Sequence, residues 1–443
     1  MVASIISVLA ATDRASLCLV IVGCGWWGGC DVSQPMMASY RDEEEEEGGK
    51  EEGAVGGMGS GGGLSSSGAG DRGSQTDVSI VSTVPDRHGF HGGAQYTPDE
   101  KQIIPASVLL RRELKWISML NNWEKYMTKK YKKVRERCRK GIPPSVRPRA
   151  WQYLCGGKLL MDGHMLPTGT GMVPEAGLVA KGGQVIAAAP GNRITYANLI
   201  AQEGDPRWID DIQKDLHRQF PFHEMFMTEK GHGQQDLFHV LKAYSVLNPH
   251  IGYCQAQAPL AAFLLMHMPA EHAFWCLVSL CDKYLDGYYS LNMETLQLDG
   301  EILFALLKRV APNVYKHLKK QKIAPILYMT EWFLCVYTRT LPWTTILRIW
   351  DMFLCEGIKI VFKVALVLLR FGLGRSDILR KCPTMYETLE ALRNLPSHVM
   401  EEEFIVHQIQ RLNLTDEDFQ KEHERQLVRR KTMQENGGKH AGR

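Results

Sequence analysis

Apolar residues recur every three or four positions along most of the chain from about residue 105 onwards. Within the segment 111–140, one such stripe is made of Trp116, Leu120, Trp123, Met127, Tyr131 and Val134. This spacing places the apolar side chains on one face of an α-helix. The same criterion predicts helices at 146–154, 205–220, 237–247, 259–268, 270–285, 301–321, 327–338, 343–355, 358–373, 385–393 and 401–412. Because no segment here shows the alternation typical of a strand, we expect an all-α fold with many medium-length helices.

The pattern divides the chain into three parts. Residues 1–104 are expected to be disordered, because the stretch 33–93 holds an acidic run and Gly- and Ser-rich segments with few large apolar residues. Residues 111–400 are predicted to form the helical domain, in which the Gly-, Ala- and Pro-rich segment 161–192 is expected to be a flexible insertion. The charged segment 413–443 is expected to be a fraying helix followed by a disordered tail.

The first 30 residues form an apolar leader that matches no familiar targeting segment. They lack the basic start and the clear cleavage site of a signal peptide. Their longer apolar run falls short of the roughly 20 residues that a membrane helix needs. We expect a disordered leader or one that touches a membrane weakly.

Charge and cysteine content argue against several classes of protein. A formal net charge of +3 over 443 residues is too small to indicate nucleic-acid binding. The eleven cysteines contain no CxxC spacing, which argues against a zinc site, and we expect no metal. Free cysteines in a reducing cytoplasm are the simplest interpretation.

One strongly basic segment lies at 129–140. Its cations are Lys129, Lys130, Lys132, Lys133, Arg135, Arg137, Arg139 and Lys140. They form either the solvated face of a helix or a surface that contacts an acidic membrane or an acidic partner.

An arginine and a glutamine in separate segments are the candidate chemical groups. Arg218 lies on the predicted helix that begins at Asp205, and at about 100° per residue it is nearly opposite the apolar stripe of that helix. Taken alone, Arg218 would be a solvated side chain paired with Asp215, and Gln255 would be a polar loop residue. The chain has no GxxxxGK[ST] motif, so we do not expect it to hydrolyse a nucleotide by itself.

Four short motifs place these two residues in a wider pattern. They are RxxxW at Arg147–Trp151, IxxDxxR at Ile212–Arg218, YxQ at Tyr253–Gln255 and WDxFxxEG at Trp350–Gly357. In this order and spacing the chain resembles the TBC-domain Rab GTPase-activating proteins over roughly 140–373. The sequence around Arg218 and Gln255 is most similar to that of the subgroup of TBC domain family member ten.

This resemblance implies a multi-helix TBC domain whose partners are GTP-bound Rab GTPases. It implies that Arg218 is an arginine finger and that Gln255 is a glutamine finger that positions water. Asp215 and Tyr253 would support the fingers. No cofactor is expected on the chain, because the partner GTPase carries GTP and Mg²⁺. The expected role is regulation of vesicle trafficking from the cytoplasm, with recruitment to plasma or endosomal membranes.

The same resemblance assigns the remaining motif residues to the scaffold rather than to the chemistry. These are Arg147, Trp151, Trp350, Asp351, Glu356 and Gly357. The sequence departs from the family pattern at Ala256, where most members have glycine, and in the insertion at 161–192. The alternative function is a non-catalytic TBC scaffold that binds GTPases or membrane-associated proteins. The presence of both fingers favours the catalytic interpretation.

Overall fold

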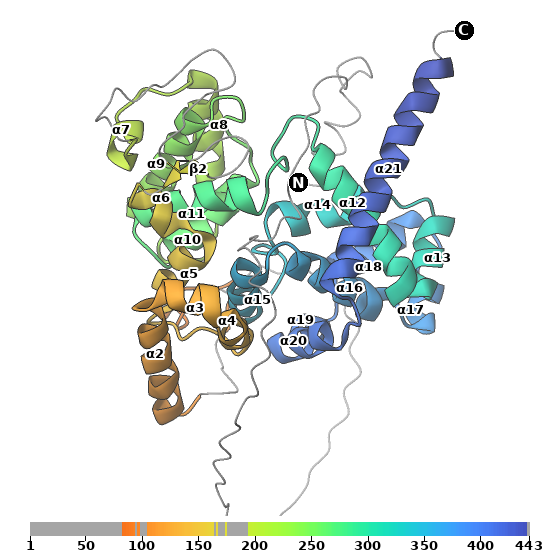
Figure 1. Cartoon of the computed structure of the whole chain (residues 1–443), viewed down its shortest axis with the longest axis horizontal. Coiled ribbons are helices and arrows are strands. Elements are labelled where there is room, and N and C mark those ends of the chain that lie inside the picture. Colours follow the sequence, from red (N-terminus) through yellow and green to blue (C-terminus); the bar gives the residue numbers. More distant parts are fainter. Residues whose placement is uncertain are drawn as a thin grey trace, which may run out of the picture. The chain divides into compact units, whose positions relative to one another are not determined.

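Helices make up almost all the regular structure of the chain, as the apolar periodicity predicts (Figure 1). The computed structural model describes residues 82–93, 95–97, 104–163, 165–166, 173–174 and 194–440. The apolar leader, the acidic run and most of the predicted insertion at 161–192 lie outside these residues. The all-α prediction is therefore confirmed for the described part of the chain.

The helices fall into two groups along the sequence. The first comprises α2 (Ala106–Leu120), α3 (Trp123–Lys129), α4 (Tyr131–Arg139), α5 (Arg147–Cys155), α6 (Gly157–Met161), α7 (Tyr196–Ile200), α8 (Pro206–Leu216), α9 (His232–Leu247), α10 (Gln257–Leu265) and α11 (Ala270–Lys283). The second comprises α12 (Glu294–Val310), α13 (Pro312–Lys320), α14 (Ile326–Leu334), α15 (Trp343–Glu356), α16 (Lys359–Leu373), α17 (Ser376–Lys381), α18 (Met385–Arg393), α19 (Ser397–Met400), α20 (Glu402–Arg411) and α21 (Asp416–His440). Within the predicted insertion, the two-residue strands β1 (Met165–Leu166) and β2 (Val173–Pro174) pair antiparallel.

The segment predicted as one basic helix over 111–140 is three helices, α2, α3 and α4. The backbone leaves the helical conformation at Asn122 and again at Lys130, whose φ angles are −127° and −135°. Each break turns the following helix, so Trp116 and Val134 stay buried while Tyr131 is exposed. Apolar spacing alone does not reveal these breaks, because the stripe continues across both of them.

The segment predicted as one helix over 301–321 is also divided. It contains the end of α12 and the whole of α13, with Ala311 outside the helical region at φ −144°. Pro312 opens α13, where a missing backbone N–H is tolerated.

A cluster of aromatic rings joins the two groups of helices. The ring of Phe263 on α10 lies 5.5 Å from that of Trp151 on α5 and 4.5 Å from that of Trp350 on α15, between ring centroids. Trp343, at the start of α15, contacts Phe263 as well. Burial of large aromatic side chains is a major source of stability. The cluster, which includes the motif residues Trp151 and Trp350, therefore fixes α5, α10 and α15 against one another.

Part of the segment 1–104, expected to be disordered, is ordered and packed. Phe90 is almost fully buried, and its ring lies 4.8 Å from those of His223 and Trp343. The backbone N–H of His91 donates to the carbonyl of Phe222 at 2.8 Å. A buried ring and backbone hydrogen bonds to the segment around His223 anchor this polar stretch, and composition reveals neither.

The segment 413–443, expected to be a fraying helix and tail, contains a helix that packs on the domain. α21 lies along α12, and Phe419 is completely buried with its ring 5.7 Å from that of Phe362 (Figure 1). Further along, Arg430 forms a bidentate ion pair with Glu301 of α12. The helix α20 also packs on α15 and α16, so the domain extends beyond the predicted boundary at residue 400.

None of the helices in the described ranges combines the length and the apolar character needed to cross a lipid bilayer.

Candidate functional site

Arg218 lies in the turn that follows α8 rather than on the helix itself. The helix ends at Leu216, and the buried side chain of Gln219 donates to the carbonyl of Asp215 at 3.0 Å, which satisfies one of its terminal carbonyls. The side chain of Arg218 is 35% exposed and pairs with Asp215. The sequence correctly indicates this pair, but it places the arginine on the helix, because apolar spacing does not reveal that the helix ends at Leu216.

Asp215 connects Arg218 to a second segment of the chain. One of its carboxylate oxygens pairs with Nη2 of Arg218, and the other accepts a 2.6 Å hydrogen bond from the hydroxyl of Tyr253. Asp215 and Tyr253 are both buried. Burial and this hydrogen bond raise the pKa of Tyr253 far above its ordinary value, so the phenol stays a donor. Asp215 therefore positions Arg218, and the hydrogen bond from Tyr253 in turn positions Asp215.

Gln255 lies directly against the guanidinium of Arg218. Its side-chain amide faces both terminal nitrogens of the arginine, and the amide orientation that satisfies these donors presents the oxygen to them. The side chain is half-buried and projects from the turn before α10. The structure therefore brings together the two residues that the sequence selects from separate segments.

The loop that carries Gln255 is shaped by residues that the motifs do not include. Gly252 has a φ of +63°, and a Cβ there would lie 2.1 Å from the indole of Trp208 on α8. Only glycine fits this approach. The buried side chain of Gln257 accepts from the backbone N–H of Cys254 at 3.0 Å. Gly252 was recognisable in the sequence only as a glycine shortly before YxQ, and its packing against Trp208 is a tertiary effect.

Asp351 is the meeting point of two of the motifs. This fully buried carboxylate accepts from the backbone N–H of Ile142 at 2.7 Å, from the indole of Trp151 at 2.8 Å and from Nε of Arg147 at 3.2 Å. Burial raises its pKa, and the Arg147 charge with the three donors opposes that rise. RxxxW and WDxFxxEG therefore form one buried network between α5 and α15.

The other residues of the WDxFxxEG motif end the helix and attach it to its neighbours. The indole of Trp350 donates to the carbonyl of Val336 at 3.1 Å. Both carboxylate oxygens of Glu356 accept from Arg139 of α4 at 2.6 Å. Gly357 ends α15 with a φ of +83°, a conformation that favours glycine. The contacts of Trp350 and Glu356 join α15 to other parts of the domain.

Across the described ranges, no group of three or more His, Cys, Asp and Glu side chains could hold a metal ion.

Comparisons with known proteins identify the family of the chain. Residues 144–379 match the family model of the Rab-GTPase-TBC domain. The chain is 53% identical over 344 residues to TBC1 domain family member 10A of Mus musculus. The aligned residues cover 78% of this chain and 63% of that protein. It is 53% identical over 342 residues to TBC1 domain family member 10B of the same organism, but these residues span only 39% of that relative and 77% of this chain. It is 51% identical over 352 residues to TBC1 domain family member whacked of Drosophila melanogaster, covering 80% and 89%.

Among solved structures, the crystal structure of the Chlamydomonas flagellar RabGAP TBC domain is similar with a TM-score of 0.51 at 22% identity. The match covers 74% of this chain and 99% of that one, and it supports the fold. Together, the family model and the relatives confirm the resemblance inferred from the four motifs, including the subgroup.

Proposed function

This chain belongs to the Rab-GTPase-TBC domain family, and we propose that it accelerates GTP hydrolysis by Rab GTPases with Arg218 and Gln255. The partner would carry GTP and Mg²⁺, so the chain needs no cofactor and has no turnover of its own. Arg218 would stabilise the charge that develops on the transferred phosphoryl group. Gln255 would orient the attacking water.

The convergence of these two side chains is the observation that carries the proposal. Arg218 and Gln255 come from the ends of different helices and are in contact. A guanidinium binds a neutral amide oxygen more weakly than it binds an anionic phosphate, which can pair with it in a bidentate way. An incoming phosphate can therefore replace Gln255 on the guanidinium, while the buried carboxylate of Asp215 keeps the arginine in place.

The positioning and hydrogen bonding of Arg218 also favour a catalytic role over a non-catalytic scaffold. A scaffold needs no positioned arginine, yet Arg218 is held by Asp215 and, through it, by Tyr253. Its Nε is buried and makes no hydrogen bond within the described residues. Such an incompletely satisfied cation suits a site that receives an anion. On this proposal the chain acts in the cytoplasm on membrane-bound Rab proteins and thereby regulates vesicle trafficking.

Single-turnover GTP hydrolysis by a panel of purified Rab proteins tests the proposal. We expect the full chain to accelerate at least one of them by about 10³-fold or more. Binding of GTP-loaded Rab proteins is measured in parallel. If the chain binds them without accelerating hydrolysis of any, the non-catalytic scaffold is the correct function. If it neither binds nor accelerates, both interpretations fail.

A further inference from the structure

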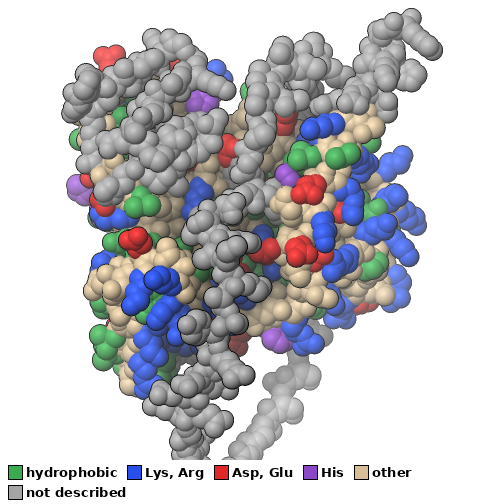
Figure 2. Space-filling view, in the orientation of Figure 1, with side chains coloured by type: hydrophobic (Ala, Val, Ile, Leu, Met, Phe, Trp, Pro, Cys, Tyr) green, Lys and Arg blue, Asp and Glu red, His purple; other side chains and the backbone are tan. Residues whose placement is uncertain are grey.

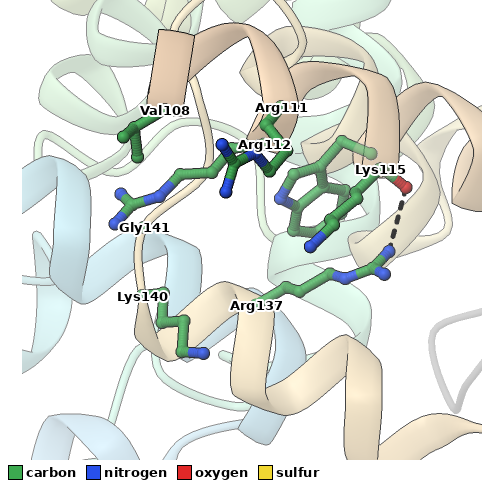
Figure 3. A pocket seen from close by; sticks show the side chains of 8 residues that line it. Val108, Arg111, Arg112, Lys115, Arg137, Lys140 and Gly141 are labelled. Atoms are coloured by element: carbon green, nitrogen blue, oxygen red, sulfur yellow. Dashed lines mark hydrogen bonds between the residues drawn. The ribbon is translucent and has the colours of Figure 1, made fainter. Parts of the chain in front are cut away.

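A cavity between α2 and α4 is lined by cations and contains no acidic side chain. Its volume is about 410 Å³, and its floor is the buried ring of Trp116. The basic residues around it are Arg111, Arg112, Lys115, Arg137 and Lys140. Figure 3 shows side chains from the two helices facing each other across this space. We refer to it as the cationic cavity.

The cations of the cavity differ from the other arginines nearby. Arg139, Arg147 and Arg348 each form an ion pair, with Glu356, Asp351 and Glu402 respectively. In the part of the chain that the structure describes, no acid is ion-paired with any of the five cavity cations. Arg137 donates to the backbone carbonyl of Lys115 at 2.9 Å and to the sulfur of Met119 at 3.6 Å, and neither acceptor carries a charge (Figure 3). The positive charges of Arg139, Arg147 and Arg348 are thus neutralised by carboxylates, whereas those of the cavity arginines are not.

Acidic residues do lie in the neighbouring depression, and one of them is paired with another arginine. That depression shares Arg112 and Lys140 with the cationic cavity and is lined on its far side by Glu401, Glu402 and Glu403. Glu402 is committed to Arg348. On α2 itself, Glu113 accepts from Ser145 at 2.6 Å. The uncompensated charge of the cavity therefore favours an external anion with several negative charges.

An exposed apolar stripe on α2 indicates what carries that anion. Leu110, Leu114 and Ile117 are spaced by four and three residues and are 55%, 58% and 39% exposed. At about 100° per residue, Arg111 lies roughly 60° and Lys115 roughly 100° around the helix from Leu114, so these two cations border the stripe on one side. Figure 2 shows Lys and Arg side chains gathered beside hydrophobic ones over the part of the molecule where Figure 1 places α2 to α4.

We propose that the cationic cavity and the α2 stripe together dock the chain on a bilayer that contains lipids with polyphosphorylated headgroups. Apolar side chains flanked by cations are typical of helices that lie in a membrane interface. The headgroup phosphates enter the cationic cavity, and Leu110, Leu114 and Ile117 enter the acyl boundary. Of the basic segment 129–140, only Arg137 and Lys140 take part, and Arg139 is excluded by its ion pair with Glu356.

Vesicle sedimentation with the full chain tests this surface. The vesicles are phosphatidylcholine alone, phosphatidylcholine with phosphatidylinositol bisphosphate, and phosphatidylcholine with phosphatidylserine at matched charge. We expect binding chiefly to the second. The cavity variant, R111Q/R112Q/K115Q, should bind these vesicles at least about tenfold more weakly, because attraction to an anionic surface is carried by each cation. The matched control K316Q/K319Q/K320Q removes three exposed charges from α13 and should bind as the unaltered chain does.

Four results would overturn the proposal. They are no binding to phosphoinositide vesicles, equal binding to the phosphatidylserine vesicles, equal losses in the two triple variants, and unchanged vesicle binding by L114Q/I117Q. The last result, together with tight binding of soluble inositol trisphosphate, would assign the cavity to a free polyphosphate. Hydrolysis measured in solution is a separate readout that the cavity variant should leave unchanged, so failure here is distinct from failure of the proposed GTPase activation.

Discussion

Tyr253 and Asp215 are joined by a 2.6 Å hydrogen bond between two segments that meet only in the folded chain. The same carboxylate pairs with Arg218, and Arg218 contacts Gln255. Four residues of two separate motifs thus form one connected group. Each of these residues restrains the next one. Single substitutions should therefore lower the stimulated rate of GTP hydrolysis by different amounts, most for the two fingers and less for the residues that position them.

Arg218→Ala should abolish stimulated hydrolysis while leaving the fold intact. An arginine finger contributes about 10³- to 10⁵-fold in rate, whereas a partly exposed ion pair contributes little to stability. The measurements are single-turnover hydrolysis and thermal unfolding. Lys214→Ala, which removes an exposed cation from α8, is the control and should retain activity. A substituted domain that keeps most of its activity would show that Arg218 is not the finger.

Gln255→Ala should remove hydrolysis without weakening Rab binding, because its interaction forms chiefly in the transition state. The sharper test uses a Rab whose own catalytic glutamine is replaced by leucine. If Gln255 acts in trans, the unaltered chain still accelerates this Rab and the variant does not. The unaltered chain could instead accelerate hydrolysis by the native Rab but not by the glutamine-to-leucine Rab. That result would show that Gln255 has only a structural role.

Tyr253→Phe should lower the stimulated rate by about five- to tenfold with little change in melting temperature. The substitution keeps the ring but removes one hydrogen bond to Asp215, worth about 1 kcal/mol. Arg218 then has more freedom, and hydrolysis slows because it depends on the position of the guanidinium. Rab affinity should stay close to that of the unaltered chain. A rate equal to the native one would show that Asp215 holds the arginine without help.

Trp151→Ala should destabilise the domain by about 3–5 kcal/mol. The substitution empties part of the aromatic cluster and removes an indole donor from the buried carboxylate of Asp351. Denaturant unfolding measures the loss. Arg149→Ala, at an exposed position on the same helix, should change stability little. Comparable unfolding of the two variants would contradict the scaffold role of Trp151.

Phe419→Ala should also destabilise the domain by about 3–5 kcal/mol, since this ring is completely buried. The result would establish that α21 belongs to the domain rather than to a tail. Val428→Ala, on an exposed position of the same helix, is the control. If Phe419→Ala unfolds at the same denaturant concentration as the unaltered chain, α21 contributes nothing to stability.

The sequence by itself determined the helical class, because a period of three to four residues is a local property that survives without knowledge of the fold. The order and spacing of the four motifs also selected Arg218 and Gln255 as candidate site residues. The same motifs selected Arg147, Trp151 and Asp351 as candidate scaffold residues. Where helices break at Asn122 and Lys130 was not evident, since the apolar stripe continues across both positions.

Only the tertiary structure decided which side chains meet. Asp351 collects donors from residues about 200 positions away, and Gly252 is required because Trp208 packs over it. Phe90 and Phe419 lie in polar, charged surroundings in the sequence, yet each fills a space that distant helices create. The physical reason is the same in all these cases: periodicity reports which face of an element is apolar, whereas burial and hydrogen bonding depend on the element that comes to lie against that face.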